Sequence, residues 1–178
     1  DQTTHTIQGL LKTKQFHYII TLNPEILIRA QSLPKIKTII QNATLCTADG
    51  VGIRLYSKLK KNITLPKVTG IDLTEKLLQQ SLSFYIVGAK PNILKHVIKN
   101  ITKTYPKAIL LGAHHGYYKK EEEKNIIKDI EAKKPNILLV ALGFPKQEQF
   151  INDCKPFLTT TVAIGIGGTL DVISNQIT

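Results

Sequence analysis

Polar side chains follow directly on an apolar run in the stretch VALGFPKQEQF. The run ends at Leu142, and Lys146, Gln147 and Glu148 come next, at the first turn of a predicted helix. Capping a helix start needs one hydrogen-bonding side chain, so capping alone does not account for Gln147 and Glu148 together. We interpret these two residues as candidates for binding a polar ligand.

Two further strand ends carry candidate residues. Thr21 and Asn23 flank the last apolar residue of a predicted buried strand, and Asn23 also fits the N-cap of the helix that follows. Asp49 comes directly after another predicted strand and is the acidic candidate, although it also fits a simple N-cap. A carboxylate among neutral hydrogen-bonding side chains suits an enzyme that acts on a polar or phosphorylated metabolite.

Other loops carry weaker signals. Gly167–Gly168 allows a backbone to approach a ligand closely, with the start of the next helix available to an anion; a plain tight turn is the alternative. The stretch GIGGTL lacks the third glycine of a dinucleotide-binding fingerprint. His114 and His115 have no further metal ligands at suitable spacing, so we expect a loop there. Lys67 either contacts a phosphate or is simply solvated.

Apolar, β-branched runs alternate with amphipathic stretches along the chain. Strands are predicted over residues 16–22, 43–48, 83–88, 107–113, 136–142 and 161–166. Helices are predicted over residues 23–31, 49–61, 71–80, 91–105 and 121–134, with Pro24, Pro91 and Pro145 each at a first helical position. This alternation predicts a single α/β domain over residues 1–178, a Rossmann-like parallel sheet with helices on both faces. Its ligand site is expected at the carboxyl ends of the strands.

The composition of the 178 residues narrows the class of protein. A net charge of +11 suits nucleic acid, an anionic membrane surface or a phosphate-bearing ligand, and a lysine-rich genome is the alternative cause. No nucleic-acid-binding signature and no P-loop motif is present. Cys46 and Cys154 form no metal-binding pattern, and we expect reduced thiols. No apolar run approaches the roughly 20 residues needed to cross a bilayer.

The motifs taken together resemble a known family. TLNPEI, TADGVGI, VTGIDL, YIVGAK, ALGFPKQEQFI and IGIGGTLDV occur in the order found in the WecG/TagA/CpsF glycosyltransferases, glycosyltransferase family 26, from about residue 7 to residue 173. The chain is most similar to the teichoic-acid branch. That resemblance implies transfer of N-acetylmannosamine from UDP-N-acetylmannosamine to undecaprenyl-diphosphate-linked N-acetylglucosamine, with inversion at the donor sugar and without a metal or other cofactor.

The resemblance also implies a role for each candidate. Asp49 is the expected general base for the acceptor hydroxyl. The residues expected to line the sugar pocket, bind the substrate or order the site are Thr21, Asn23, Gln147 and Glu148. Gly167, Gly168 and Asp171 resemble the segment near the donor nucleotide. Lys67 stands where family members often carry arginine, which predicts weaker bidentate phosphate binding.

The resemblance extends to partners and location. Family members form dimers or trimers and are expected in the cytoplasm, peripheral at the inner face of the membrane. Their C-terminal tail contacts the anionic membrane surface; the sequence LDVISNQIT stops before it, which predicts a core domain with weakened membrane contact. Three alternatives stay open: another UDP-sugar donor such as N-acetylmannosaminuronic acid or glucose, a basic nucleotide- or nucleic-acid-binding module, and an inactive scaffold. For the glycosyltransferase, we do not expect nucleic acid as a partner.

Overall fold

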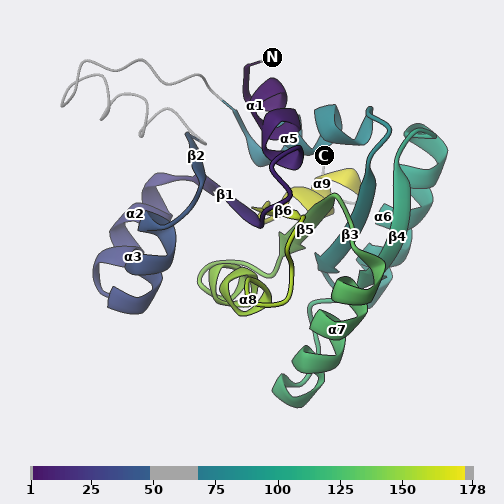
Figure 1. Cartoon of the computed structure of the whole chain (residues 1–178). Helices are drawn as coiled ribbons and strands as arrows, with labels where there is room; N and C mark the ends of the chain where they lie inside the picture. Colours follow the sequence, from purple (N-terminus) through teal and green to yellow (C-terminus); the bar gives the residue numbers. More distant parts are fainter. Residues whose placement is uncertain (1, 49–67, 175–178) are drawn as a thin grey trace.

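The computed structural model describes residues 2–48 and 68–174, and the strands of this part form one parallel sheet (Figure 1). These strands are β1 (His17–Leu22), β2 (Leu45–Ala48), β3 (Ser83–Gly88), β4 (Ile109–His114), β5 (Ile137–Ala141) and β6 (Val162–Gly165). They lie in the order β2-β1-β6-β5-β3-β4, and each neighbouring pair is parallel. The predicted parallel α/β architecture is confirmed.

Helices cover both faces of the sheet. One face packs against α1 (Gln2–Leu11), α5 (Gly70–Leu78), α6 (Pro91–Thr104) and α9 (Thr169–Ile173). The other packs against α2 (Pro24–Gln31), α3 (Pro34–Gln41), α7 (Glu123–Lys133) and α8 (Lys146–Cys154), and a short 3-10 helix, η1 (Lys120–Glu122), precedes α7. In Figure 1, α1 and α5 lie above the sheet and α8 lies below it. The result is a three-layer sandwich.

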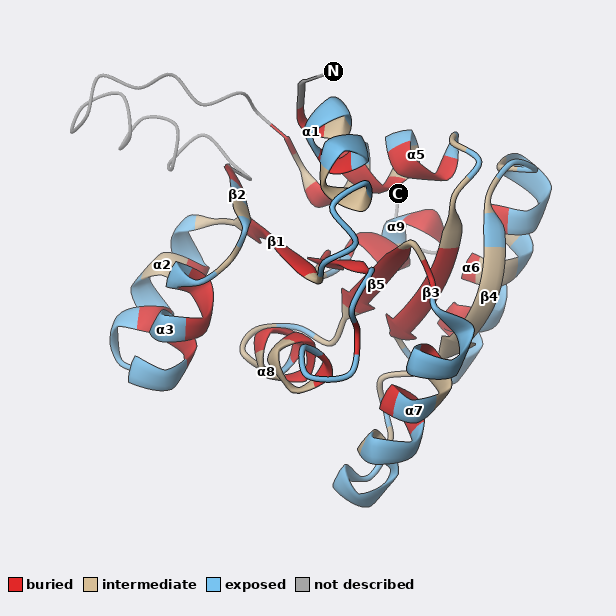
Figure 2. Cartoon of the chain, in the orientation of Figure 1, coloured by how far each residue is buried: buried red, intermediate tan, exposed pale blue. Residues whose placement is uncertain are grey.

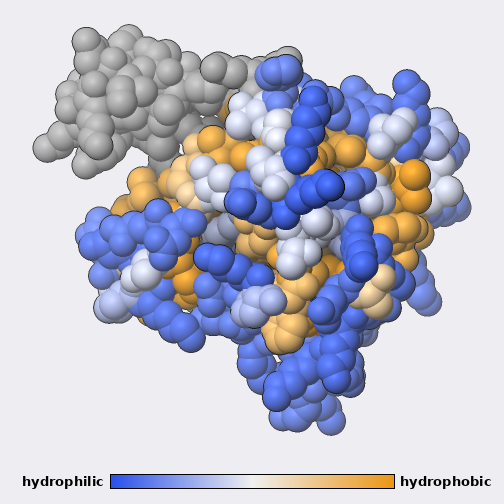
Figure 3. All heavy atoms as spheres, viewed as in Figure 1, coloured by the Kyte–Doolittle hydropathy of each residue, from blue (hydrophilic) through white to orange (hydrophobic). Residues whose placement is uncertain are grey.

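The core explains why the central strands read as continuous apolar runs. The four residues Ile137 to Val140 of β5 are fully buried, because helices exclude water from both faces (Figure 2). On α6, buried Ile93, Val97 and Ile101 recur every four residues and form one apolar stripe. Burying each such side chain fully contributes roughly 1.5–3 kcal/mol. The outer surfaces of α2, α3 and α7 are mainly hydrophilic (Figure 3).

The helix boundaries correct part of the sequence prediction. Pro24 and Pro91 do open their helices, as predicted. Pro145 does not take a first helical position: it is the N-cap of α8, whose first intrahelical bond runs from Gln149 N to Pro145 O. The reason is a turn at Gly143, which has a φ of 74° and delays the helix. The helices α1 and α3 were not predicted, and the helix predicted over 49–61 lies outside the described residues.

The topology opens crevices along the carboxyl edge of the sheet. The helices that follow neighbouring strands alternate between the two faces: α2 after β1, α9 after β6, α8 after β5, α6 after β3 and α7 after β4. Chains that leave neighbouring strands toward opposite faces open a space between them, and ligands bind in such spaces.

Within the described residues, no helix is both long and apolar enough to span a membrane.

Candidate functional site

A large cavity occupies the crevice between β3 and β5. Its volume is about 890 Å³, toward the upper end of the range typical of small-molecule sites. The loops that follow β3, β4, β5 and β6 line it, through residues 89–90, 116–119, 141–143 and 167–168, together with Ile93, Lys146 and Asp171. Gly116 allows the loops to approach each other, because a Cβ there would lie 2.8 Å from Leu142 Cδ2 and 3.3 Å from Gly88 Cα.

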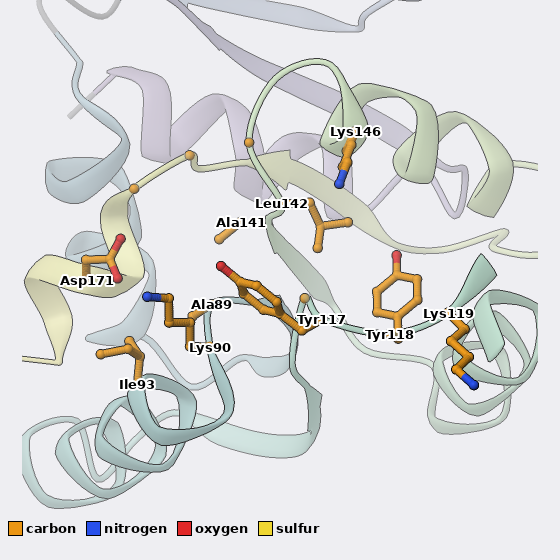
Figure 4. Close-up of a pocket in the computed structure, with 14 residues that line it drawn as sticks. Ala89, Lys90, Ile93, Tyr117, Tyr118, Lys119, Ala141, Leu142, Lys146 and Asp171 are labelled. Atoms are coloured by element: carbon orange, nitrogen blue, oxygen red, sulfur yellow. The ribbon is translucent and has the colours of Figure 1, made fainter.

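The charged and aromatic groups of this cavity suit an anionic ligand with a flat ring. Lys90 extends toward Asp171 beside the ring of Tyr117, and Lys146 enters from the opposite side (Figure 4). Tyr117 is 67% exposed, so one face of its ring is available for stacking. Burial first, and the Glu123 carboxylate second, raise the pKa of Tyr118, which stays a neutral phenol at neutral pH.

A second, smaller pocket occupies the crevice between β1 and β6. Its volume is about 320 Å³. It is lined by Thr21 near the end of β1, by Asn23 just after that strand, by Gln147 of α8, by residues 166–169 after β6 and by the start of α5. Both pockets reach the Gly167–Gly168 turn, so this turn separates them. Gly167 has a φ of 52°, in the left-handed region that glycine adopts most readily.

Hydrogen bonds fix the polar residues of the smaller pocket. The Asn23 side chain accepts a bond from Ile26 N at 2.8 Å and caps α2, so the capping interpretation is correct for this residue. Thr21 Oγ1 donates to Gly165 O at 2.9 Å and ties β1 to β6. Gly167 N donates to Gln147 Oε1 at 3.2 Å. Each side chain therefore has a structural bond as well as a place in the pocket wall.

Glu148 lies behind this wall, in the apolar layer under α8. It is fully buried, and its Oε1 accepts a bond from Gln147 Nε2 at 2.9 Å. Burial raises the pKa of Glu148. Glu148 Oε2 and the buried Tyr18 hydroxyl form no hydrogen bond of ordinary length among the described residues. Burial also raises the pKa of Tyr18, and a longer polar contact between the two groups acts to raise it further and to lower the pKa of Glu148.

The structure brings together most of the residues predicted from the sequence. Thr21, Asn23, Gln147, Gly167 and Gly168 line the smaller pocket, and the two glycines line the large cavity together with Asp171. Asp49 and Lys67 lie outside the described residues, so their predicted roles stay predictions.

Lys146, the first of the three polar residues after the β5 turn, lines the large cavity. Lys90 and Tyr117 also line it but were not singled out as binding candidates from the sequence. Both lie in loops that follow strands, and that position was the available signal. His114 ends β4 and does not lie in the predicted loop, whereas His115 leads into the cavity wall at Gly116. The described residues hold no cluster of three or more potential metal ligands.

The comparison with protein families decides the classification. The model of the glycosyl transferase WecG/TagA/CpsF family matches residues 1–178. The chain belongs to this family. The family assignment agrees with the resemblance carried by the sequence motifs.

Two curated relatives in the WecG/TagA/CpsF family carry the same name, N-acetylglucosaminyldiphosphoundecaprenol N-acetyl-beta-D-mannosaminyltransferase. The protein from Bacillus spizizenii is 30% identical over 164 residues, which cover 90% of this chain and 63% of the relative. The protein from Bacillus subtilis strain 168 is 29% identical over 163 residues, which cover 89% of this chain and 63% of the relative. The chain thus spans less than two thirds of the length of these relatives.

Proposed function

We propose that this chain is the catalytic core of a hexosyltransferase that moves N-acetylmannosamine from UDP-N-acetylmannosamine to undecaprenyl-diphosphate-linked N-acetylglucosamine. The observation that carries the proposal is the pair of pockets meeting at Gly167–Gly168. A glycosyl transfer needs adjoining sites for a donor nucleotide and for the two sugars, and this edge of the sheet offers such a pair. The relatives' names supply the donor sugar and the acceptor.

The large cavity is the proposed site for the UDP part of the donor. The exposed ring of Tyr117 can stack on a nucleobase, and the Asp171 carboxylate can accept a hydrogen bond from the N–H of a uracil ring. Lys90 and Lys146 supply positive charge for the diphosphate. The Gly167–Gly168 turn carries no side chain that would block the path of the diphosphate toward the smaller pocket.

The smaller pocket is the proposed site of sugar transfer. Its neutral side chains, Thr21, Asn23 and Gln147, offer hydrogen bonds of the kind that sugar hydroxyls make. Asp49 directly follows β2, the neighbour of β1, and is the proposed general base. It takes the proton of the acceptor hydroxyl while that oxygen bonds to the anomeric carbon. The bond from that carbon to the diphosphate oxygen breaks, UDP leaves, and the configuration inverts.

The lipid acceptor places the proposed reaction at a membrane surface. A net charge of +11 favours approach to the anionic inner leaflet, where Lys67 and the relatives' additional length are proposed to assist with the diphosphate and the surface. The proposed location is the cytoplasmic face of the membrane. A homodimer or homotrimer is the proposed assembly, by resemblance to the family.

A transfer assay tests this function. The chain, with and without a family-type C-terminal tail, is incubated with UDP-N-acetylmannosamine and a lipid-diphosphate N-acetylglucosamine analogue, and Asp49→Asn serves as the variant. The proposal predicts a disaccharide product from the parent and at least a hundredfold slower transfer, with unchanged UDP binding, from Asp49→Asn. Transfer from UDP-N-acetylmannosaminuronic acid or UDP-glucose, and not from UDP-N-acetylmannosamine, would show that the proposed donor sugar is wrong. Binding to duplex DNA without any UDP-sugar binding would contradict the proposal.

A further inference from the structure

Gln147 and Glu148 are adjacent in sequence but differ in what they can reach. Gln147 is 2% exposed and forms part of the wall of the smaller pocket. Glu148 is fully buried and lines neither the large cavity nor the smaller pocket. Its carboxylate therefore touches no ligand in the described arrangement, and any effect on the site must pass through a neighbour.

That neighbour is the Gln147 amide, which is bonded at both ends. Its Nε2 donates to Glu148 Oε1 at 2.9 Å, and its Oε1 accepts from Gly167 N at 3.2 Å. The two bonds are compatible with one amide orientation only. In the flipped orientation an N–H group would face the Gly167 N–H, and the amide oxygen would face a carboxyl oxygen.

We propose that Glu148 is a positioning residue, which holds the Gln147 amide in the orientation that binds Gly167 and thereby fixes the turn between the two pockets. This inference rests on the proposed function, because it assigns that turn to the path of the donor diphosphate. Glu148 takes no part in the chemistry and acts on both pockets through one backbone N–H group.

The surroundings of the pair support a role beyond packing. Glu148 Oε2 makes no hydrogen bond of ordinary length among the described residues and has only a longer contact with the Tyr18 hydroxyl, and a buried carboxyl oxygen so poorly partnered destabilises the fold. An apolar side chain of similar length would avoid this cost, so stability alone does not favour glutamate here. The Gln147 side-chain amide packs against Gly165 of β6, where only glycine leaves enough room. A Cβ at Gly165 would lie 2.9 Å from Gln147 Nε2 and 3.3 Å from Gln147 Cδ.

Two substitutions separate positioning from packing. Glu148→Met removes the acceptor oxygen and keeps the length and apolar contacts of the side chain. Glu148→Gln keeps an oxygen that can accept from Gln147 Nε2. Tyr18→Phe is the matched control, because it removes the hydroxyl near Glu148 Oε2 from the same buried layer and leaves both Gln147 bonds in place.

The readouts are hydrogen exchange at the Gly167 amide by NMR, UDP affinity by calorimetry and the melting temperature. We expect Glu148→Met to melt no lower than the parent, yet to exchange Gly167 about fivefold to tenfold faster and to bind UDP more weakly by a similar factor, as for one lost hydrogen bond. Glu148→Gln should recover most of the lost protection. Tyr18→Phe should match the parent in both exchange and affinity.

Several results would overturn the inference. One is a Glu148→Met protein with parental Gly167 exchange; another is a parent whose Gly167 amide exchanges as fast as a freely exposed one. If Glu148→Met does not fold, Glu148→Gln decides, and loss of Gly167 protection in it contradicts the proposal. The exchange measurement needs no ligand. A parent that binds no UDP would therefore refute the proposed function while the Gly167 exchange still tests the positioning role.

Discussion

Two glycine-to-alanine substitutions should change stability in opposite directions. Gly88 ends β3 beside the large cavity, has a φ of 146°, and an added Cβ would lie 2.4 Å from Ala141 O and 2.7 Å from Ala141 C. The backbone conformation costs alanine about 1–3 kcal/mol, and the clash with β5 adds about 1–3 kcal/mol. Gly9 lies exposed in α1, where an added Cβ would meet nothing within 4 Å. There alanine should stabilise the helix by about 0.5–1 kcal/mol.

Thermal denaturation measures both effects under one condition. For a domain of this size, 1 kcal/mol shifts the melting temperature by about 2–4 °C. We therefore expect Gly88→Ala to lower it by about 4–24 °C, and Gly9→Ala to raise it by about 1–4 °C. Because Gly88 is followed by Ala89 and Lys90 in the cavity wall, Gly88→Ala should also weaken UDP binding. A Gly88→Ala protein as stable as the parent would refute the close approach of β3 to β5.

Three further predictions concern the helix cap at Asn23, the buried carboxyl group of Glu148 and the positive charge of the large cavity. Asn23→Ala should destabilise the fold by about 1 kcal/mol in urea unfolding, because α2 loses its cap, whereas Asn23→Asp should not. Burial raises the pKa of Glu148, so the folded state keeps a proton that the unfolded chain releases near the ordinary pKa of 4.5. The parent should therefore lose stability relative to Glu148→Gln as pH rises from 4 toward 8. The opposite trend would mean that Glu148 is stabilised as a carboxylate. Lys90→Gln and Lys146→Gln should each weaken UDP binding by about threefold to tenfold, less so at high salt, while Lys128→Gln on α7 should have no effect.

The sequence predicted the sheet well because its strands carry a strong signal. Continuous apolar runs such as residues 136–142 occur only where both faces of a strand are covered, and the runs alternate with helices as parallel connections require. The helices α1 and α3 carry weaker signals. Both are short and contain several β-branched Thr and Ile residues, whose helix propensity is lower than that of Ala or Leu, so tertiary packing decides their conformation.

The sequence predicted where the candidate site lies better than it predicted what each of its side chains does. Polar residues after strands had to meet at one edge of a parallel sheet, and Thr21, Gln147 and Gly167 do. The sequence did not show that Asn23 is engaged as a cap or that Glu148 is buried behind Gln147, because those facts depend on the packing of α2 and α8. Nor did it single out Tyr117, whose ring becomes a cavity wall only when β4 lies beside β3.

The most direct test of the central claim is to follow the backbone amides by NMR while UDP is added. We expect saturable binding of one UDP per chain, with the largest shifts at residues 89–90, 116–119, 143 and 167–168 around the large cavity. Asp171→Asn should weaken this binding without moving it elsewhere. No shifts at these amides, or shifts confined to the opposite edge of the sheet near residues 35–44, would contradict the assignment of the donor site.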